Sequence, residues 1–157
     1  QHEEVGYNYR MSNVIAGVVR GQLTYLEEHI AQKKAIYERY KDGFKDLPVM
    51  MNPYDAKVCE PNFWLSCLLI EEEAMKKTCP MEILDKLASY NAEGRPIWKP
   101  MHMQPIFKDN PFVTGMKNGD ISDVGSDIFR RGLCLPSDNK MTIEQQNIII
   151  EIVKSCF

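Results

Sequence analysis

Residues 12–44 read SNVIAGVVRGQLTYLEEHIAQKKAIYERYKDGF, and this segment decides the class of fold. Ser12 or Asn13 can cap a first helical turn, and apolar side chains then recur close to every 3.6 residues. The spacing predicts one long helix over residues 12–44. Gly17 and Gly21 each destabilise a helix by about 1 kcal/mol relative to Ala. We therefore expect another backbone to pack closely against them. The apolar stripe consists of Ile15, Val18, Val19, Leu23, Leu26, Ile30, Ile36, Tyr37, Tyr40 and Phe44.

The rest of the chain alternates short strands with short helices. Residues 49–51 predict a strand, and residues 63–70 (FWLSCLLI) are apolar at both parities, which is typical of a central strand buried on both faces. Pro80 can open a helix, where its missing N–H has no cost. Residues 94–96 predict a second extended piece, followed by a long loop over residues 98–119, and loops of that length are usually functional.

The C-terminal third predicts a helix over residues 122–131, ended by Gly132, and a strand over residues 133–135. Thr142 and Gln145 form a capping box that opens a last helix. The apolar stripe of that helix is expected at Ile148, Ile149, Ile152 and Val153. Together these elements predict an α/β fold with helices on a small sheet. We expect a single domain over residues 1–157.

Composition excludes several classes of protein. The 157 residues are 44% hydrophobic, and 19 Lys and Arg against 22 Asp and Glu give a net charge of −3. A nucleic-acid binder usually has a basic surplus, and no apolar stretch approaches the roughly 20 residues that span a bilayer. The five cysteines have no C-x-x-C spacing, so neither a disulfide framework nor a zinc site is predicted. We expect a reducing, cytoplasmic location and no signal peptide.

Two local constellations point to binding chemistry. In residues 6–12 (GYNYRMS), the side chains of Asn8 and Arg10 share one side of an extended run. An amide beside a guanidinium near a helix N-terminus can hold an anion such as phosphate. The alternative, that Asn8 and Arg10 only fix the turn before the helix, is equally compatible with the residues.

The second constellation is residues 94–105, a proline-rich loop containing Arg95, Trp98, Lys99 and His102. Cationic and aromatic groups held by prolines suit a ligand with a ring and a phosphate. A single histidine is also common as a hydrogen-bonding structural residue. No two histidines have the spacing of metal ligands, and the sequence contains no P-loop, G-x-S-x-G or G-x-G-x-x-G motif.

Three segments carry a resemblance to a known family. They are residues 2–13 (HEEVGYNYRMSN), 95–105 (RPIWKPMHMQP) and 132–137 (GLCLPS). In this order they resemble the signatures of the pyridoxal-phosphate-dependent sugar aminotransferases of the DegT/DnrJ/EryC1/StrS family, across essentially the whole chain. The WKPMH form is closest to the subgroup that aminates UDP-linked 4-keto-6-deoxy-HexNAc sugars for polysaccharide or glycan synthesis.

The resemblance implies the C-terminal small domain of the fold-type-I aminotransferase architecture. It implies an active-site arm at residues 1–11, a long helix at 12–46 and an α/β part at 47–157. Further implications are pyridoxal 5'-phosphate as cofactor, a nucleotide-sugar substrate with glutamate as amino donor, and a homodimer with active sites between its subunits. Asn8 matches the position that reaches the cofactor phosphate across the dimer. Arg10, His102 and Trp98 match positions facing the substrate, with Arg95 and Lys99 as weaker candidates.

The sequence lacks two features that the family's catalytic site requires. No lysine stands in the family's Schiff-base context and no acidic residue is placed to pair with the pyridine nitrogen, so we assign no catalytic residue in this chain. We expect a truncated piece that is inactive and without cofactor when isolated, with exposed apolar surface and a tendency to self-associate. Two other interpretations stay open: part of a sugar dehydratase, in which histidine replaces the lysine, or a non-catalytic sugar-binding or interaction module.

Overall fold

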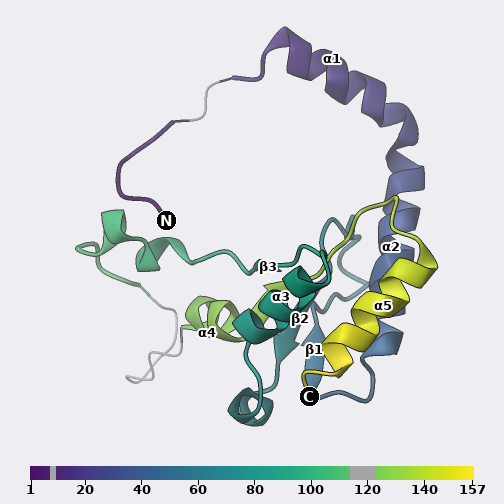
Figure 1. The fold of residues 1–157 in the computed structure, drawn as a ribbon. Coiled ribbons are helices and arrows are strands. Elements are labelled where there is room, and N and C mark those ends of the chain that lie inside the picture. Colours follow the sequence, from purple (N-terminus) through teal and green to yellow (C-terminus); the bar gives the residue numbers. More distant parts are fainter. Residues whose placement is uncertain (8–9, 114–122) are drawn as a thin grey trace.

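The computed structural model describes residues 1–7, 10–113 and 123–157. It has a small antiparallel sheet with three helices packed on one face and a helix that projects away from that body (Figure 1). The helices are α1 (Asn13–Gln22), α2 (Leu26–Gly43), α3 (Pro80–Ser89), α4 (Val124–Arg131) and α5 (Ile143–Lys154). The strands are β1 (Val49–Met51), β2 (Cys67–Ile70), β3 (Arg95–Pro96) and β4 (Gly132–Cys134). The predicted combination of helices with a small sheet is confirmed.

The long N-terminal helix is not continuous, which corrects the prediction of one helix over residues 12–44, or 12–46 by family resemblance. α1 begins with the Ile15 amide donating to Ser12 Oγ (3.3 Å). A 3₁₀ turn, Leu23–Tyr25, then separates α1 from α2. Tyr25 leaves the helical region at φ −106° and ψ 6°. This break coincides with a change of environment, because α1 buries no residue and α2 packs into the core.

The four strands lie in the order β1-β2-β4-β3, and every neighbouring pair is antiparallel. β2 is therefore an interior strand, as its apolar sequence predicted. It is shorter than the predicted strand over residues 63–70, because it begins only at Cys67. Phe63 itself has a positive φ of 52°, a conformation incompatible with an extended run. Cys67 pairs with Cys134, and Leu68 pairs with Leu133.

The core lies on one face of the sheet, between the strands and helices α2, α3 and α5. Tyr40 of α2 is fully buried and its hydroxyl donates to the Pro136 carbonyl (2.8 Å). Gln146 of α5 is also buried, and its Nε2 donates to the Ile36 carbonyl (2.8 Å). Other fully buried side chains are Phe44, Leu68, Ile70, Ile83, Leu87, Leu133, Leu135 and Val153.

The opposite face of the sheet is less covered, so the prediction that β2 is buried on both faces is wrong. Residues Leu68 and Ile70 face the core and are buried, whereas Cys67 and Leu69 are only half-buried. In the C-terminal helix the predicted capping box is present, with the Gln145 amide donating to Thr142 Oγ1 (3.2 Å). Its apolar stripe differs from the prediction in one position, since Ile148 is exposed. Ile150 of α5 is buried.

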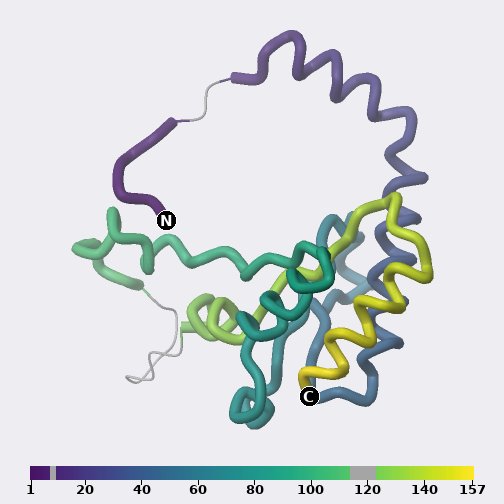
Figure 2. Tube along the Cα trace, viewed as in Figure 1, coloured from purple at the N-terminus to yellow at the C-terminus, as the bar shows by residue number. Residues whose placement is uncertain are grey.

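The N-terminal segment extends from the body along α1 and returns as an extended arm toward the loop after β3 (Figure 2). Gly17 and Gly21 have no neighbouring atom within 4 Å of an added Cβ. The close backbone packing expected at them is therefore not formed within the described residues. The expected exposed apolar surface is present here: Val14, Ile15, Val18, Val19 and Leu23 are all exposed. No helix in the described ranges is long and apolar enough to cross a membrane.

Candidate functional site

The start of the N-terminal arm contacts the loop of residues 94–105 through His2, although the two segments are far apart in the sequence. The His2 amide of the N-terminal arm donates to Gln104 Oε1 (3.0 Å), and the Ile106 amide donates to the His2 carbonyl (3.4 Å). Gln104 is buried, and its Nε2 donates to the Lys99 carbonyl (3.4 Å). The arm is thus attached to the loop that carries Trp98 and His102.

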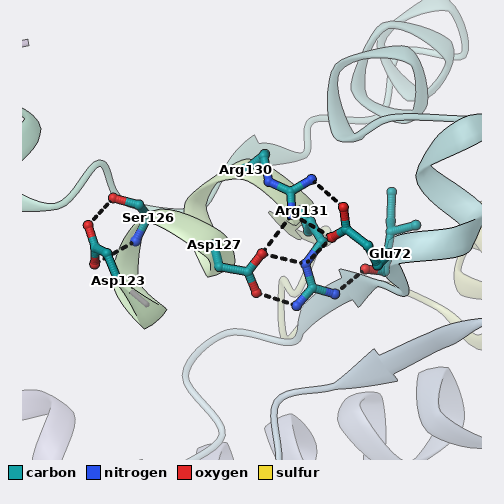
Figure 3. Close-up of polar contacts among 7 residues, drawn as sticks. Glu72, Asp123, Ser126, Asp127, Arg130 and Arg131 are labelled. Carbon is teal, nitrogen blue, oxygen red and sulfur yellow. Dashed lines mark hydrogen bonds and ion pairs between the residues drawn. The ribbon is translucent and has the colours of Figure 1, made fainter. Parts of the chain in front are cut away.

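His102 lies in a short 3₁₀ turn, Met101–Met103, and faces the first turn of α4. Its Nε2 contacts the Asp123 carboxylate and lies 3.2 Å from Ser126 Oγ. Asp123 is also the N-cap of α4 and accepts a hydrogen bond from the Ser126 amide (3.1 Å), as Figure 3 shows. The Phe112 ring lies beside the imidazole, with centroids 4.3 Å apart.

This cluster is a positioning arrangement and not a nucleophile–base–carboxylate relay. In such a relay the serine and the carboxylate meet opposite nitrogens of the imidazole. Here Ser126 and Asp123 meet the same one, Nε2. Hydrogen bonds from Ser126, with a smaller contribution from His102, lower the pKa of Asp123. An ionised carboxylate opposite Nε2 favours a proton on that nitrogen, which leaves Nδ1 as the acceptor of a neutral ring.

Asp123 was not among the site residues predicted from sequence. The local signal, an acidic residue before a helix, indicates only a cap. That Asp123 also meets His102 depends on the path of the loop between them, and part of that loop, residues 114–122, lies outside the described residues. His102 is therefore hydrogen-bonded through Nε2, as one of the two interpretations expected. A ligand would contact the ring at its Nδ1 edge.

Trp98 forms an exposed aromatic pair with Trp64. Their ring centroids are 5.7 Å apart at an interplanar angle of 36°, and the residues are 60% and 62% exposed. Two indoles so exposed to water can stack a planar ligand. Trp64 was missed in the sequence analysis because it was assigned to a buried strand. The positive φ of Phe63 places it in an irregular segment before β2.

The remaining sequence candidates have simpler environments. Arg95 lies on β3 and is engaged with Glu93, to which its Nε and Nη2 donate at 3.0 and 2.6 Å. Arg10 is exposed on the arm. Within the described ranges, no hydrogen bond or ion pair joins Arg10 to Trp98 or His102. Asn8, the predicted phosphate contact, lies outside the described residues.

A network of charges fixes α4, and with it Asp123, to the end of β2. Arg130 pairs with Glu72 and with Asp127 (2.8 Å), while Arg131 pairs with Asp127 (2.8 Å from Nε) and donates from Nη1 to the Ile70 carbonyl (2.7 Å), as Figure 3 shows. Hydrogen bonds from Arg130 lower the pKa of Glu72, and those from Arg131 lower the pKa of Asp127. The sequence analysis did not identify this network.

Comparison with known proteins identifies the family to which the chain belongs. The model of the DegT/DnrJ/EryC1/StrS aminotransferase family matches residues 1–154. EpsN of Bacillus subtilis (strain 168), assigned as a pyridoxal phosphate-dependent aminotransferase, is 38% identical over 100% of this chain and 39% of its own. The GDP-perosamine synthase of Escherichia coli O157:H7 is 25% identical over 99% of this chain and 39% of its own. Among solved structures, a DegT DnrJ EryC1 StrS aminotransferase from Brucella abortus has a TM-score of 0.75 at 21% identity, over 99% of this chain and 39% of its own.

The chain therefore belongs to the DegT/DnrJ/EryC1/StrS aminotransferase family, as its three sequence signatures predicted. It spans 39% of the length of the two curated relatives above and matches the C-terminal part of EpsN. The predicted fold class is confirmed by the likeness to solved aminotransferases. Pyridoxal phosphate is the cofactor of this family, and solved relatives include its pyridoxal and pyridoxamine forms.

Proposed function

We propose that this chain is the C-terminal part of a nucleotide-sugar aminotransferase that transfers an amino group from glutamate to a keto sugar. The observation that carries the proposal is the family match over residues 1–154, together with 38% identity to EpsN. The WKPMH segment at residues 98–102 supports a UDP-linked 4-keto-6-deoxy-HexNAc as substrate, in polysaccharide or glycan synthesis. We further propose a cytoplasmic homodimer in which the arm of one subunit completes the site of the other.

The sequence offers a group for only one part of a pyridoxal phosphate site, the phosphate contact, through Asn8. Such a site also needs a lysine tether, and the cofactor, when bound, supplies an electron sink at the carbon that exchanges the amino group. Lys33 is a half-buried lysine whose pKa is lowered by burial, but its Nζ donates to the Ser137 carbonyl and thereby holds the loop after β4. We assign no lysine of this chain as the tether, and no proton-transfer step to any of its side chains.

The roles left for this chain are binding and orientation. Asn8 is proposed to donate to the cofactor phosphate in the neighbouring subunit, and Arg10 to bind an anionic group of the nucleotide sugar. Trp98, with Trp64 beside it, is proposed to stack the planar ring of the nucleotide. The two rings are available for this because both remain largely exposed in the described structure.

His102 is proposed to orient the sugar. Asp123 holds the imidazole through Nε2, so the ring presents Nδ1 as a hydrogen-bond acceptor for a sugar hydroxyl. The network between α4 and β2 then keeps Asp123, and through it His102, in place. Asp123 is a positioning residue in this scheme, because it acts through His102.

The test uses the polypeptide that contains this chain together with the lysine-bearing segment. Incubated with pyridoxal phosphate, glutamate and the UDP-linked keto sugar, it should form the amino sugar, detected by mass spectrometry. Trp98→Ala should raise KM for the nucleotide sugar by about 10- to 100-fold, because stacking of one base contributes about 1–3 kcal/mol. The value of kcat should change much less.

Tyr90→Ala is a matched control, since Tyr90 is an aromatic residue that is also 62% exposed, at the C-terminal end of α3. It should leave KM unchanged. Failure to form any amino sugar from UDP- or GDP-linked keto sugars would refute the proposed activity. An unchanged KM for Trp98→Ala in an active enzyme would refute only the stacking role.

A further inference from the structure

Two cysteines face each other across the middle of the sheet. Cys67 of β2 and Cys134 of β4 are direct partners in the antiparallel register, and their sulfur atoms are 3.7 Å apart. The sequence analysis predicted no disulfide framework, from the spacing of the cysteines alone. Register, which the sequence did not specify, brings together two thiols that are 67 residues apart.

The backbone hydrogen bonds of Cys67 show which of the two types of antiparallel pair it forms with Cys134. The Cys67 carbonyl accepts from the Asn52 amide (3.0 Å), and the Cys67 amide donates to Asn52 Oδ1 (2.9 Å). Both backbone groups of Cys67 therefore point toward β1 and away from Cys134. Partners of this non-hydrogen-bonded type have Cα atoms about 4.5 Å apart and their side chains close together. That separation lies within the range of about 4.4–6.8 Å found for disulfides.

The pair lies on the face of the sheet opposite the core, where it can be reached. Leu68 and Leu133, one residue along each strand, are buried in the core, so Cys67 and Cys134 point to the other side. Cys134 is only 4% exposed, whereas Cys67 is half-buried. A small reagent would meet the sulfur of Cys67 first. The hydrogen bond from the Cys134 thiol also lowers the pKa of Cys67, which increases its thiolate fraction.

The other three cysteines lack this arrangement. All five lie in the described part of the chain and are reduced, and the pair at Cys67 and Cys134 is the one with a sulfur–sulfur hydrogen-bond contact. Cys59 is exposed and its Sγ donates to the Asp55 carbonyl (3.2 Å), while Cys156 Sγ donates to the Ile152 carbonyl (3.5 Å). Reactivity through exposure alone would therefore favour Cys59.

We propose that Cys67 and Cys134 form a site of reversible oxidation, in which a peroxide converts the two thiols into a cross-strand disulfide. The Cys67 thiolate attacks one peroxide oxygen and becomes a sulfenic acid, and the departing hydroxide is protonated to water. The Cys134 thiol then attacks the Cys67 sulfur, forming the S–S bond and releasing a second water. Two electrons pass from the thiols to hydrogen peroxide. A dithiol reductant restores the two thiols by disulfide exchange and is itself oxidised to a disulfide.

The test treats the folded chain with hydrogen peroxide, alkylates the remaining thiols and maps the peptides by mass spectrometry. A peptide pair linked through Cys67 and Cys134 should be the dominant product and should disappear after reduction with dithiothreitol. In urea, where the register is lost, the same treatment should give a mixture of cysteine pairs. Cys59→Ser is the matched control and should leave the linked pair unchanged.

Cys67→Ser and Cys134→Ala should each abolish the linked peptide, with circular dichroism confirming that the variants are folded. If either variant does not fold, the comparison between native protein and urea still decides. Two outcomes would overturn the proposal. One is oxidation of the folded chain at Cys59 without a bond between Cys67 and Cys134. The other is the same mixture of pairs with and without urea.

Discussion

Helices α1 and α2 come from one continuous amphipathic pattern, yet they have opposite environments. Ile15 of α1 is 52% exposed, whereas Ile36 of α2 is 4% exposed and packs with Tyr37 and Tyr40 in the core. The pattern therefore specifies which face of a helix is apolar, and says nothing about whether the covering surface belongs to the same chain. This chain has 39% of the length of its relative EpsN. Within the described residues, the apolar face of α1 is left uncovered.

The strongest test of the difference between α1 and α2 is the same substitution in both helices. Ile36→Ala should lower the free energy of unfolding by about 2–5 kcal/mol, because it leaves a cavity in the core. Ile15→Ala should change it by less than about 0.5 kcal/mol, since the side chain is already in water. Urea denaturation followed by circular dichroism measures both values. Equal losses would mean that the face of α1 is covered in solution, as by self-association, which size-exclusion chromatography would detect.

The elements that the sequence predicted well are those specified by local chemistry. Pro80, Gly132 and the Thr142 capping box lie at element ends in the structure as predicted, because each acts on its own backbone. The break at Leu23–Tyr25 and the start of β2 at Cys67, rather than at Phe63, depend on tertiary packing and backbone conformation. A periodicity argument contains no information on either.

The candidate site was predictable in its residue types but not in its contacts. Trp98 and His102 were identified from sequence, while their partners Trp64 and Asp123 were not. Each partner comes from a different segment, and its position is set by the register of the sheet and the path of a long loop. The same applies to Cys67 and Cys134, which only strand pairing brings together.

Two glycine-to-alanine substitutions should change stability by smaller amounts and in opposite directions. Gly132→Ala should destabilise the protein by about 1–3 kcal/mol, because its Cβ would lie 2.6 Å from the Ile128 carbonyl oxygen. Gly17→Ala should stabilise α1 by about 0.5–1 kcal/mol, since Ala is the better helix former. An increase of helical ellipticity measures this gain. In the parent protein, where we expect a close backbone, Gly17→Ala should become unfavourable; a gain there as well would contradict close packing at Gly17.

The smallest expected effect on stability is that of acid. It distinguishes the ion pairs that hold α4 from the apolar packing of the core, which does not titrate. Hydrogen bonds from Arg130, Ser126 and Arg131 lower the pKa values of Glu72, Asp123 and Asp127, respectively.

A carboxyl group whose pKa is lower in the folded state binds fewer protons there than in the unfolded chain, so its stabilisation is complete only above about pH 5. It is lost as the pH falls through the lowered values. The urea concentration at the midpoint of unfolding should therefore decrease as the pH falls from 5 to 3. At high salt this decrease should be slight, because salt screens these exposed ion pairs. Asp127→Asn should flatten this dependence, whereas Asp85→Asn on α3, an exposed carboxyl outside the network, should not. An equally steep decrease in the Asp127→Asn variant would mean that the ion pairs drawn in Figure 3 do not anchor α4.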